Sequence, residues 1–235
     1  MSQSASVSHQ FLPLQECHKF LAELLDDPPN FELIMESYTG RVISRLAFGS
    51  VNHTAPIATN SHALLHAISP AAHFTNIMPQ LTRLPEWLSP WKRTERARHN
   101  RERDFFLRTF DTVKNEANTG PTPTSFMRTF LESHKQERME DIEGAYVVGM
   151  LGLAGLLTTA SAMMTYILAM CLHPEWQAKL QEELDRVCGD RMPETTDSPQ
   201  LPVLRAVIKE IMRWRPVTPS SKAPPHLAQR KEPQH

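Results

Sequence analysis

Glu210 and Arg213, near the carboxyl end of the chain, have a spacing at which two charged side chains can act together. Side chains three residues apart are neighbours on a helix, and here the acid precedes the base, so the chemistry open to them is an ion pair. Two other pairs have the same spacing, Glu95–Arg98 and Glu183–Arg186. The surroundings of Glu210 must therefore decide between a solvated surface pair and a structural one.

Thr158 and Thr159 are the second candidate, within a stretch that has no charged residue from Gly144 to Leu172. A threonine hydroxyl in a helix can donate to the carbonyl one turn earlier, or open the hydrogen-bond ladder locally. The plainer interpretation of the two threonines is a small polar contact between helices.

The apolar residues around Glu210 predict the helix that carries it. They recur at steps of three and four residues, which is the pattern of a helix with one buried face: Leu201, Leu204, Val207, Ile208, Ile211 and Trp214. Pro216 ends this helix, because proline has no amide hydrogen to donate.

The rest of the chain also predicts helices joined by turns, so the expected fold class is mainly α. There are 8 glycines and 19 prolines, the prolines lie between periodic stretches, and alternating strand patterns are scarce. Predicted helices span residues 12–25, 31–48, 91–116, 126–135, 144–172 and 175–187. Asn30 is expected to cap the second of these and Gly49 to end it. Residues 50–90, divided by prolines, predict two short helices with loops.

Three stretches of sequence together resemble a known family. They are Ala154-Gly155-Leu156-Leu157-Thr158-Thr159, the helix that begins Leu172-His173-Pro174-Glu175, and the Glu210-x-x-Arg213 segment that continues as Trp214-Arg215-Pro216-Val217-Thr218-Pro219. This combination resembles a cytochrome P450, a haem-thiolate monooxygenase, and is most similar to fungal microsomal members. The resemblance is strong from about Ala145 to Pro219 and weaker from Leu12 to Gly49.

The resemblance implies a fold, an activity and roles for particular residues. The chain would be the central helical portion of the cytochrome P450 fold, about its D to K helices. Thr158 would line the oxygen site, Ala154, Gly155 and Leu157 would face haem or substrate, and Glu210 with Arg213 would be a structural pair on the proximal side. In a complete member, haem, O2 and electrons from an NADPH–cytochrome reductase oxygenate a small apolar substrate of the secondary-metabolite type.

Two departures from the family pattern bear on activity. Leu157 stands where the family has a carboxylate linked to proton delivery, and no Phe-x-x-Gly-x-Arg-x-Cys-x-Gly loop occurs. The only cysteines are Cys17, Cys171 and Cys188, and Cys188 reads as an ordinary residue near a helix end, before Gly189. The expectation is therefore a protein truncated at both ends, with no axial cysteine, no bound haem and no activity. Its parts would be a polar tail over 1–11, a partial helical domain over 12–219 and a disordered tail over 220–235.

Composition bears on partners and location. Net charge is -1 and 22% of residues are charged, which gives no argument for a nucleic-acid partner. The basic residues between Trp91 and Arg108 alternate with acids around their helix, which predicts a solvated surface.

Three scattered cysteines favour a reducing compartment. The first ten residues resemble neither a signal peptide nor the anchor that holds the family at the endoplasmic reticulum, so the chain is expected to be cytoplasmic or aggregated.

Three alternatives deserve comparison with this interpretation. Residues 144–172 are apolar and long enough for a single membrane span, but their flanks carry no lysine or arginine bias, and a buried core helix is favoured. A helical regulatory or assembly protein that binds a partner of unknown identity is the second alternative. A metal site at His62 and His66 is the third, and it lacks a further ligand at a recognisable offset.

Overall fold

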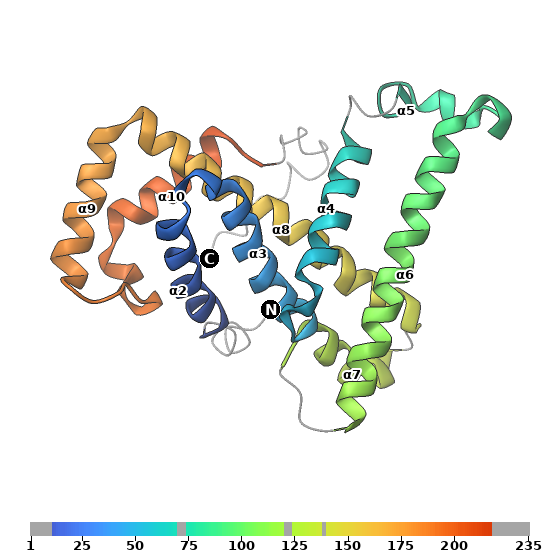
Figure 1. Cartoon of the computed structure of the whole chain (residues 1–235), viewed down its shortest axis with the longest axis horizontal. Coiled ribbons are helices and arrows are strands. Elements are labelled where there is room, and N and C mark those ends of the chain that lie inside the picture. Colours follow the sequence, from blue (N-terminus) through green and yellow to red (C-terminus); the bar gives the residue numbers. More distant parts are fainter. Residues whose placement is uncertain (1–10, 70–73, 120–123, 138–139, 218–235) are drawn as a thin grey trace, which may run out of the picture. The chain divides into compact units, whose positions relative to one another are not determined.

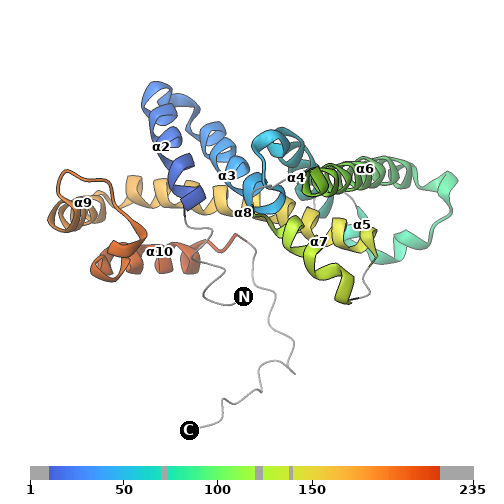
Figure 2. The same ribbon diagram turned by 90° about the horizontal axis from the view of Figure 1, so that it is seen from below.

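The computed structural model describes residues 11–69, 74–119, 124–137 and 140–217, and every regular element in these ranges is helical (Figures 1 and 2). This confirms the mainly α fold class. The chain divides into two compact units, residues 1–160 and 161–235. The tail predicted over 220–235, and all but Phe11 of the tail predicted over 1–11, lie outside the described residues.

The first unit contains six complete helices and most of a seventh within the described ranges. They are α2 (Phe11–Asp26), α3 (Phe31–Phe48), α4 (Thr54–Ile68), the short α5 (Phe74–Ile77), α6 (Pro90–Thr119), α7 (Phe126–Glu137) and α8 (Asp141–Leu172). Four 3-10 turns separate some of them: Pro28–Asn30, Val51–His53, Pro79–Arg83 and Glu86–Leu88. The described part of residues 50–90 thus holds two helices, as predicted, but only α5 is short. The longer α4 includes Pro56 in its first turn, where proline is tolerated.

The second unit contains the last turns of α8, then α9 (Pro174–Cys188), a 3-10 turn (Thr195–Gln200) and α10 (Pro202–Trp214). Its small core joins Ala169 and Met170 of α8 to Leu180 of α9 and to Val207 and Ile211 of α10. These last two belong to the apolar stripe that the spacing predicted.

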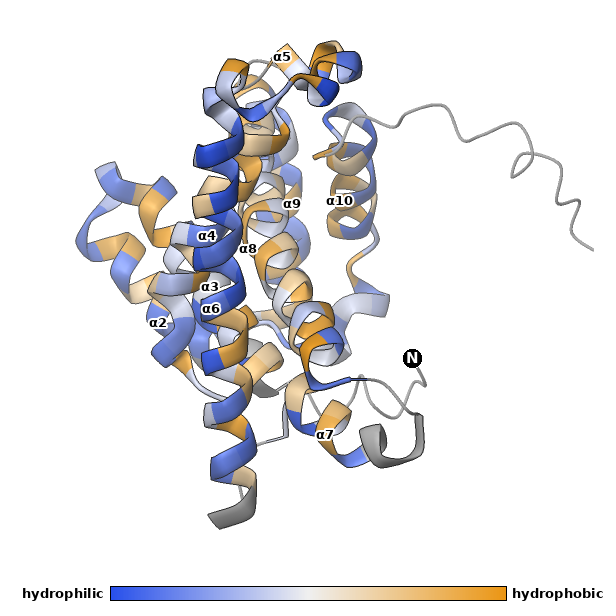
Figure 3. Ribbon diagram, turned by 90° about the vertical axis from the view of Figure 1, so that its right-hand side faces the viewer, coloured by the Kyte–Doolittle hydropathy of each residue, from blue (hydrophilic) through white to orange (hydrophobic). Residues whose placement is uncertain are grey.

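The core of the first unit forms against one face of α8. Ala145, Val148, Leu153 and Leu156 of that helix are buried among residues of the surrounding helices, including Phe48, Ile57, Phe106, Phe110 and Met127. Figure 3 shows the contrast between the mostly apolar α8 and the largely polar α6. The interpretation of 144–172 as a core helix therefore has structural support.

Two glycines let aromatic rings lie directly on the backbone of α8. A Cβ at Gly149 would be 2.3 Å from the ring of Phe106, and one at Gly144 would be 2.0 Å from the ring of Phe130. Because Phe106 is fully buried, it has no room to move away. Glycine is needed at these positions so that α6 and α7 can approach α8 closely.

Helix ends follow the sequence with one exception. Gly49 has a φ of 83°, and its amide donates to the Arg45 carbonyl at 2.8 Å, as expected for a helix that ends at glycine. Asn30 lies at the predicted cap position of α3 but does not cap it. Its amide group donates instead to the Asp27 carboxylate at 2.7 Å, so the prediction of a side-chain cap was wrong.

Ion pairs hold α2 against α3. The Arg41 guanidinium lies 2.7 Å from the carboxylate of Glu16 and 2.9 Å from that of Glu23, and Glu16 is almost fully buried. A buried carboxylate is stable only when it is paired, and Arg45 also lies 2.9 Å from Glu16, so two arginines of α3 compensate this charge.

Among the described helices, α8 is the one long and apolar enough to cross a membrane. A third of its most apolar stretch is buried within the protein, and the core helix of a soluble protein can have the same length and composition.

Two glycine variants of α8 should separate close packing from helix propensity. Gly149→Ala places a methyl group against the buried Phe106 ring and should lower the free energy of unfolding by about 1–3 kcal/mol. Gly152→Ala is the control, because a Cβ there meets Phe48 only at 3.7 Å. It should be neutral or stabilising by up to ~1 kcal/mol, since alanine favours helix. Urea unfolding measures both, and equal effects would contradict the packing argument.

Candidate functional site

The threonine turn lies in the part of α8 that belongs to the first unit. The Thr158 hydroxyl donates to the Ala154 carbonyl at 2.6 Å and lies 3.5 Å from the Gly155 carbonyl. This is the bond to the preceding turn that a threonine within a helix can form. The hydroxyl hydrogen is therefore engaged, while the lone pairs of the oxygen remain available to accept hydrogen bonds.

The residues predicted to surround Thr158 do not all face the same way. Ala154 is exposed, whereas Leu157 is half-buried and packs on the core of the first unit. At Gly155 a Cβ would lie 2.8 Å from Cδ1 of Ile43, so this position faces α3. The structure therefore groups Ala154 with Thr158 and turns Gly155 and Leu157 toward neighbouring helices. The role of the four residues toward haem or substrate stays a prediction.

The side of α8 that carries Ala154 is apolar and uncovered in the first unit. Val147, Met150 and Leu151 are exposed by 59%, 37% and 48%, and they precede Ala154 and Thr158 at helical steps of three and four residues. An apolar surface that includes the Thr158 hydroxyl is thereby available beside the threonine turn.

Glu210 and Arg213 form the ion pair that their spacing predicted. Nε of Arg213 donates to Oε2 of Glu210 at 2.8 Å, and a second guanidinium nitrogen donates to Oε1. These hydrogen bonds lower the pKa of the Glu210 carboxyl and raise that of Arg213. Both side chains are exposed, and among the described residues no third charged group joins them.

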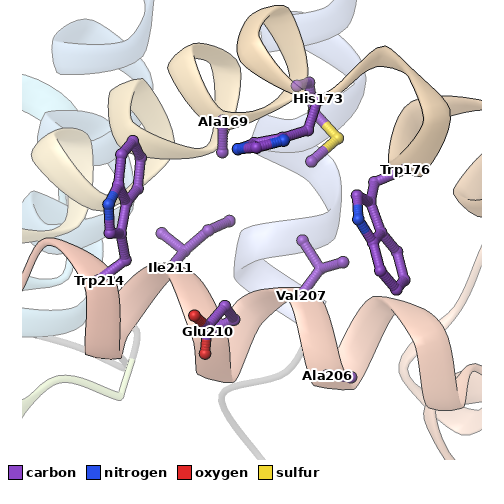
Figure 4. A pocket seen from close by; sticks show the side chains of 9 residues that line it. Ala169, His173, Trp176, Ala206, Val207, Glu210, Ile211 and Trp214 are labelled. Carbon is purple, nitrogen blue, oxygen red and sulfur yellow. The ribbon is translucent and has the colours of Figure 1, made fainter.

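A cavity of about 450 Å³ lies beside this pair in the second unit (Figure 4). Figure 4 shows the indoles of Trp176 and Trp214 at its two ends, with Glu210 on α10 and His173 on the opposite wall. The remaining lining residues are apolar: Ala169, Met170, Ala206, Val207 and Ile211. The cavity is thus a mainly apolar space with one carboxylate and one imidazole.

Glu183 has a role that sequence reasoning missed. Its spacing to Arg186 is that of a local ion pair. The Glu183 side chain is instead buried and accepts hydrogen bonds from the backbone of α10. Its two carboxylate oxygens accept the backbone amides of Val203 at 2.9 Å and Leu204 at 3.0 Å. These amides have no partner within the first turn of a helix, so Glu183 caps α10 from α9.

Asp197 is a second missed residue and organises the connection between α9 and α10. Its carboxylate accepts two hydrogen bonds from the Arg191 guanidinium, at 2.8 and 2.6 Å, and one from the Glu194 amide at 2.8 Å. The Arg191 hydrogen bonds, above all, hold the pKa of Asp197 well below its usual range. The Glu194-x-x-Asp197 spacing is that of a capping box, and this spacing could have predicted the role of Asp197 from the sequence.

The cysteines do not fit the thiolate ligand of a haem. Cys188 ends α9, as predicted, and its sulfur lies 3.8 Å from an Asp197 oxygen. Burial, and the Asp197 carboxylate next to it, raise the pKa of this thiol and keep it protonated. Burial also raises the pKa of Cys17, while Cys171 is exposed. In the described ranges no three His, Cys, Asp or Glu residues form a metal-binding cluster.

The other candidate clusters have ordinary partners. His62 lies 2.9 Å from the Glu36 carboxylate. On α6, Arg98 is paired with Glu95 and Glu102, both at 2.8 Å. The Glu95–Arg98 spacing thus gives a pair of the same local kind as Glu210–Arg213.

An α-helical chain with a threonine turn in a long apolar helix and a later Glu-x-x-Arg pair has the features of a haem-thiolate monooxygenase. The family model for cytochrome P450 matches residues 17–224, and the chain belongs to this family. The match thus includes residues 17–49, most of the region where the resemblance by motif was weaker.

Monooxygenases of fungi are among its relatives. The cytochrome P450 monooxygenase virE of Hypocrea virens is 32% identical over 92% of this chain, and alnH of Emericella nidulans is 31% identical over 92%. The monooxygenase fogE of Aspergillus ruber is 29% identical over 90%. The chain spans 41% of the length of each of these three relatives.

The Asp197 hydrogen bonds make a prediction about acid stability. Because the pKa of Asp197 is lowered by folding, its stabilisation is complete above the unfolded value of about 3.9 and is lost as pH falls toward the folded value. Asp197→Asn should therefore lower the urea midpoint at pH 7, and the difference from wild type should shrink below about pH 4. Glu194→Gln serves as the matched control, since it leaves the Arg191 guanidinium paired. A difference that is independent of pH would contradict the assignment.

Proposed function

We propose that the chain forms the central part of a fungal cytochrome P450 that inserts one oxygen atom of O2 into a small apolar substrate of the secondary-metabolite type. The family match over residues 17–224 supports the reaction class. The observation that carries the proposal within this chain is the Thr158 turn, which lies on the uncovered apolar side of α8 next to Ala154. Electrons would come from an NADPH–cytochrome reductase, as the family implies.

The apolar side of α8 supports the substrate class. Val147, Met150 and Leu151 offer exposed hydrocarbon surface along the same side as Ala154. A substrate that binds there gains free energy by removing apolar surface from water, at about 25 cal/mol per Å². Thr158 carries a hydroxyl on this side, and it would orient the reacting end of the substrate or of oxygen.

The side chains of Thr158 and Leu157 determine how this turn could take part in proton transfer. The Thr158 hydrogen is donated to the Ala154 carbonyl, so in this state the hydroxyl accepts a hydrogen bond and does not donate one. Leu157 has no titratable group. Proton delivery along this turn would therefore rely on water held by the Thr158 oxygen, in place of a carboxylate relay. A positioned carboxylate that acts as a general acid or base typically contributes about 10²- to 10⁴-fold to a rate.

We infer that none of the three cysteines serves as a haem ligand. Burial and the nearby Asp197 carboxylate raise the pKa of the Cys188 thiol, and Cys17 and Cys171 lie on α2 and near the end of α8. We therefore propose that the 235-residue chain by itself binds no thiolate-ligated haem. The haem chemistry would require a cysteine loop from another segment.

Carbon monoxide difference spectra of the reduced protein test this proposal. The chain alone should lack the Soret band of thiolate-ligated haem. A fusion that adds the cysteine-loop segment of a related monooxygenase after Pro219 should gain this band with Leu157 still in place. Haem binding depends on the cysteine ligand, whereas a carboxylate at position 157 would affect only proton delivery. The same fusion with the loop cysteine changed to alanine is the control. A thiolate band from the unfused chain would overturn the proposal.

A further inference from the structure

A cavity of about 430 Å³ lies between α4 and α6, two helices of the first unit that contact each other (Figure 1). On the side of α4 it is lined by Pro56, in the first turn of the helix, and by His53, directly before it. On the side of α6 the lining residues are Arg101, Asp104, Phe105, Arg108, Thr109 and Thr112. A cavity of this volume is large enough for a small organic molecule.

Two arginines at this cavity are available to bind an anion. Arg101 and Arg108 are seven residues apart, which places them about two turns apart on the same face of α6. Within the described ranges neither guanidinium forms an ion pair or a hydrogen bond. Elsewhere on the same helix, Arg98 is held by the carboxylates of Glu95 and Glu102.

The hydroxyl of Thr109 is a buried hydrogen-bonding group on the wall of this cavity. Thr109 is only 2% exposed, and its hydroxyl has no hydrogen-bond partner in the part of the chain that the structure describes. The hydroxyl of Thr112, by contrast, donates to the Arg108 carbonyl at 2.8 Å. A buried hydroxyl without a partner costs free energy, and a ligand that accepts its hydrogen removes this cost.

The charge of the lining fits a ligand with one negative charge. Arg101 and Arg108 each carry a positive charge and Asp104 a negative one, so together they carry one net positive charge. Burial lowers the pKa of His53, although the charge of Glu116 acts in the opposite direction, so the imidazole is neutral at pH 7. The amino end of α4 adds a partial positive charge.

The cavity also offers flat apolar surface. The rings of His53 and Phe105 have centroids 6.5 Å apart, and the buried Phe48 lies 5.3 Å from the first and 6.2 Å from the second. Pro56 adds aliphatic surface. Because Phe48 holds these rings against the core of the first unit, an apolar group can bind on them with little loss of side-chain freedom.

We propose that the cavity between α4 and α6 binds a small organic carboxylate with a flat apolar body. The guanidiniums of Arg101 and Arg108 hold the carboxylate, since a planar guanidinium matches its two oxygens, and the Thr109 hydroxyl donates to it. The rings of His53 and Phe105 contact the apolar body. The site includes neither the Thr158 turn nor a cysteine, so its existence is independent of the proposed monooxygenase function.

Fluorine NMR titration of the 235-residue chain with para-fluorobenzoate, at constant ionic strength, tests the proposal. Binding should saturate at millimolar concentrations or below, and the neutral para-fluorobenzamide should bind at least about tenfold more weakly, because it lacks the charge that the arginines bind. Inorganic phosphate at the same concentration should not displace para-fluorobenzoate. Absence of binding, equal binding of the amide, or displacement by phosphate would each overturn the proposal.

Variants of α6 locate the site. Arg101→Gln and Arg108→Gln should each raise the Kd for para-fluorobenzoate about three- to tenfold, since each removes a charge-assisted hydrogen bond at a partly solvated position. Arg103→Gln is the matched control, because Arg103 is exposed on the same helix but does not line the cavity. It should change the Kd by less than about twofold. Equal effects of the three variants would indicate diffuse attraction to the basic helix and would contradict the site.

Two further variants separate binding from damage to the fold. Thr109→Val should raise the Kd about threefold without lowering the thermal midpoint of the ligand-free chain, because the hydroxyl has no partner to lose. Asp104→Asn removes the negative charge from the lining and should lower the Kd about twofold or more. Unchanged binding in Thr109→Val, or weaker binding in Asp104→Asn, would overturn the proposed arrangement.

Discussion

The burial of one face of α8 is the constraint on which the described structure depends. The helix has no charged side chain from Gly144 to Leu172, so one face must be covered by other helices. Glycines at 144, 149 and 155 bring α7, α6 and α3 within contact of its backbone. With that face fixed, the side of α8 that carries Ala154 and Thr158 is left uncovered in the first unit, and this is the side for which we propose a ligand.

Local features could be predicted from the sequence because their partners are close along the chain. The Glu210–Arg213 pair and the Thr158 bond to Ala154 both span one helical turn, so spacing alone specifies them. The same reasoning located most helices to within three residues, since apolar periodicity and proline or glycine punctuation act locally. The prediction that the Asn30 side chain caps α3 was wrong because this side chain donates to a nearby acceptor, the Asp27 carboxylate.

Contacts between helices could not be predicted, because they depend on how the helices pack and not on spacing. Glu183 has the spacing of a local ion pair, yet it is buried and accepts backbone amides of α10. Ser61 of α4 is likewise buried and donates to a carbonyl of α8. Gly155 lies close to α3, where a Cβ would be 2.8 Å from Ile43, and its role toward haem or substrate stays a prediction. A sequence pattern assigns a residue to a helix face, and only the neighbouring helix decides what that face touches.

Because Glu183 of α9 caps α10, the contact between these two helices does not depend only on the residues that connect them. α9 and α10 are joined directly by this carboxylate and by the contacts of Leu180 with Val207 and Ile211, and not only through residues 189–201. A chain cut in that connection would keep the two helices together. Apart from the residues held by Arg191 and Asp197, the length of the connection is therefore not needed to set the register of α10 against α9.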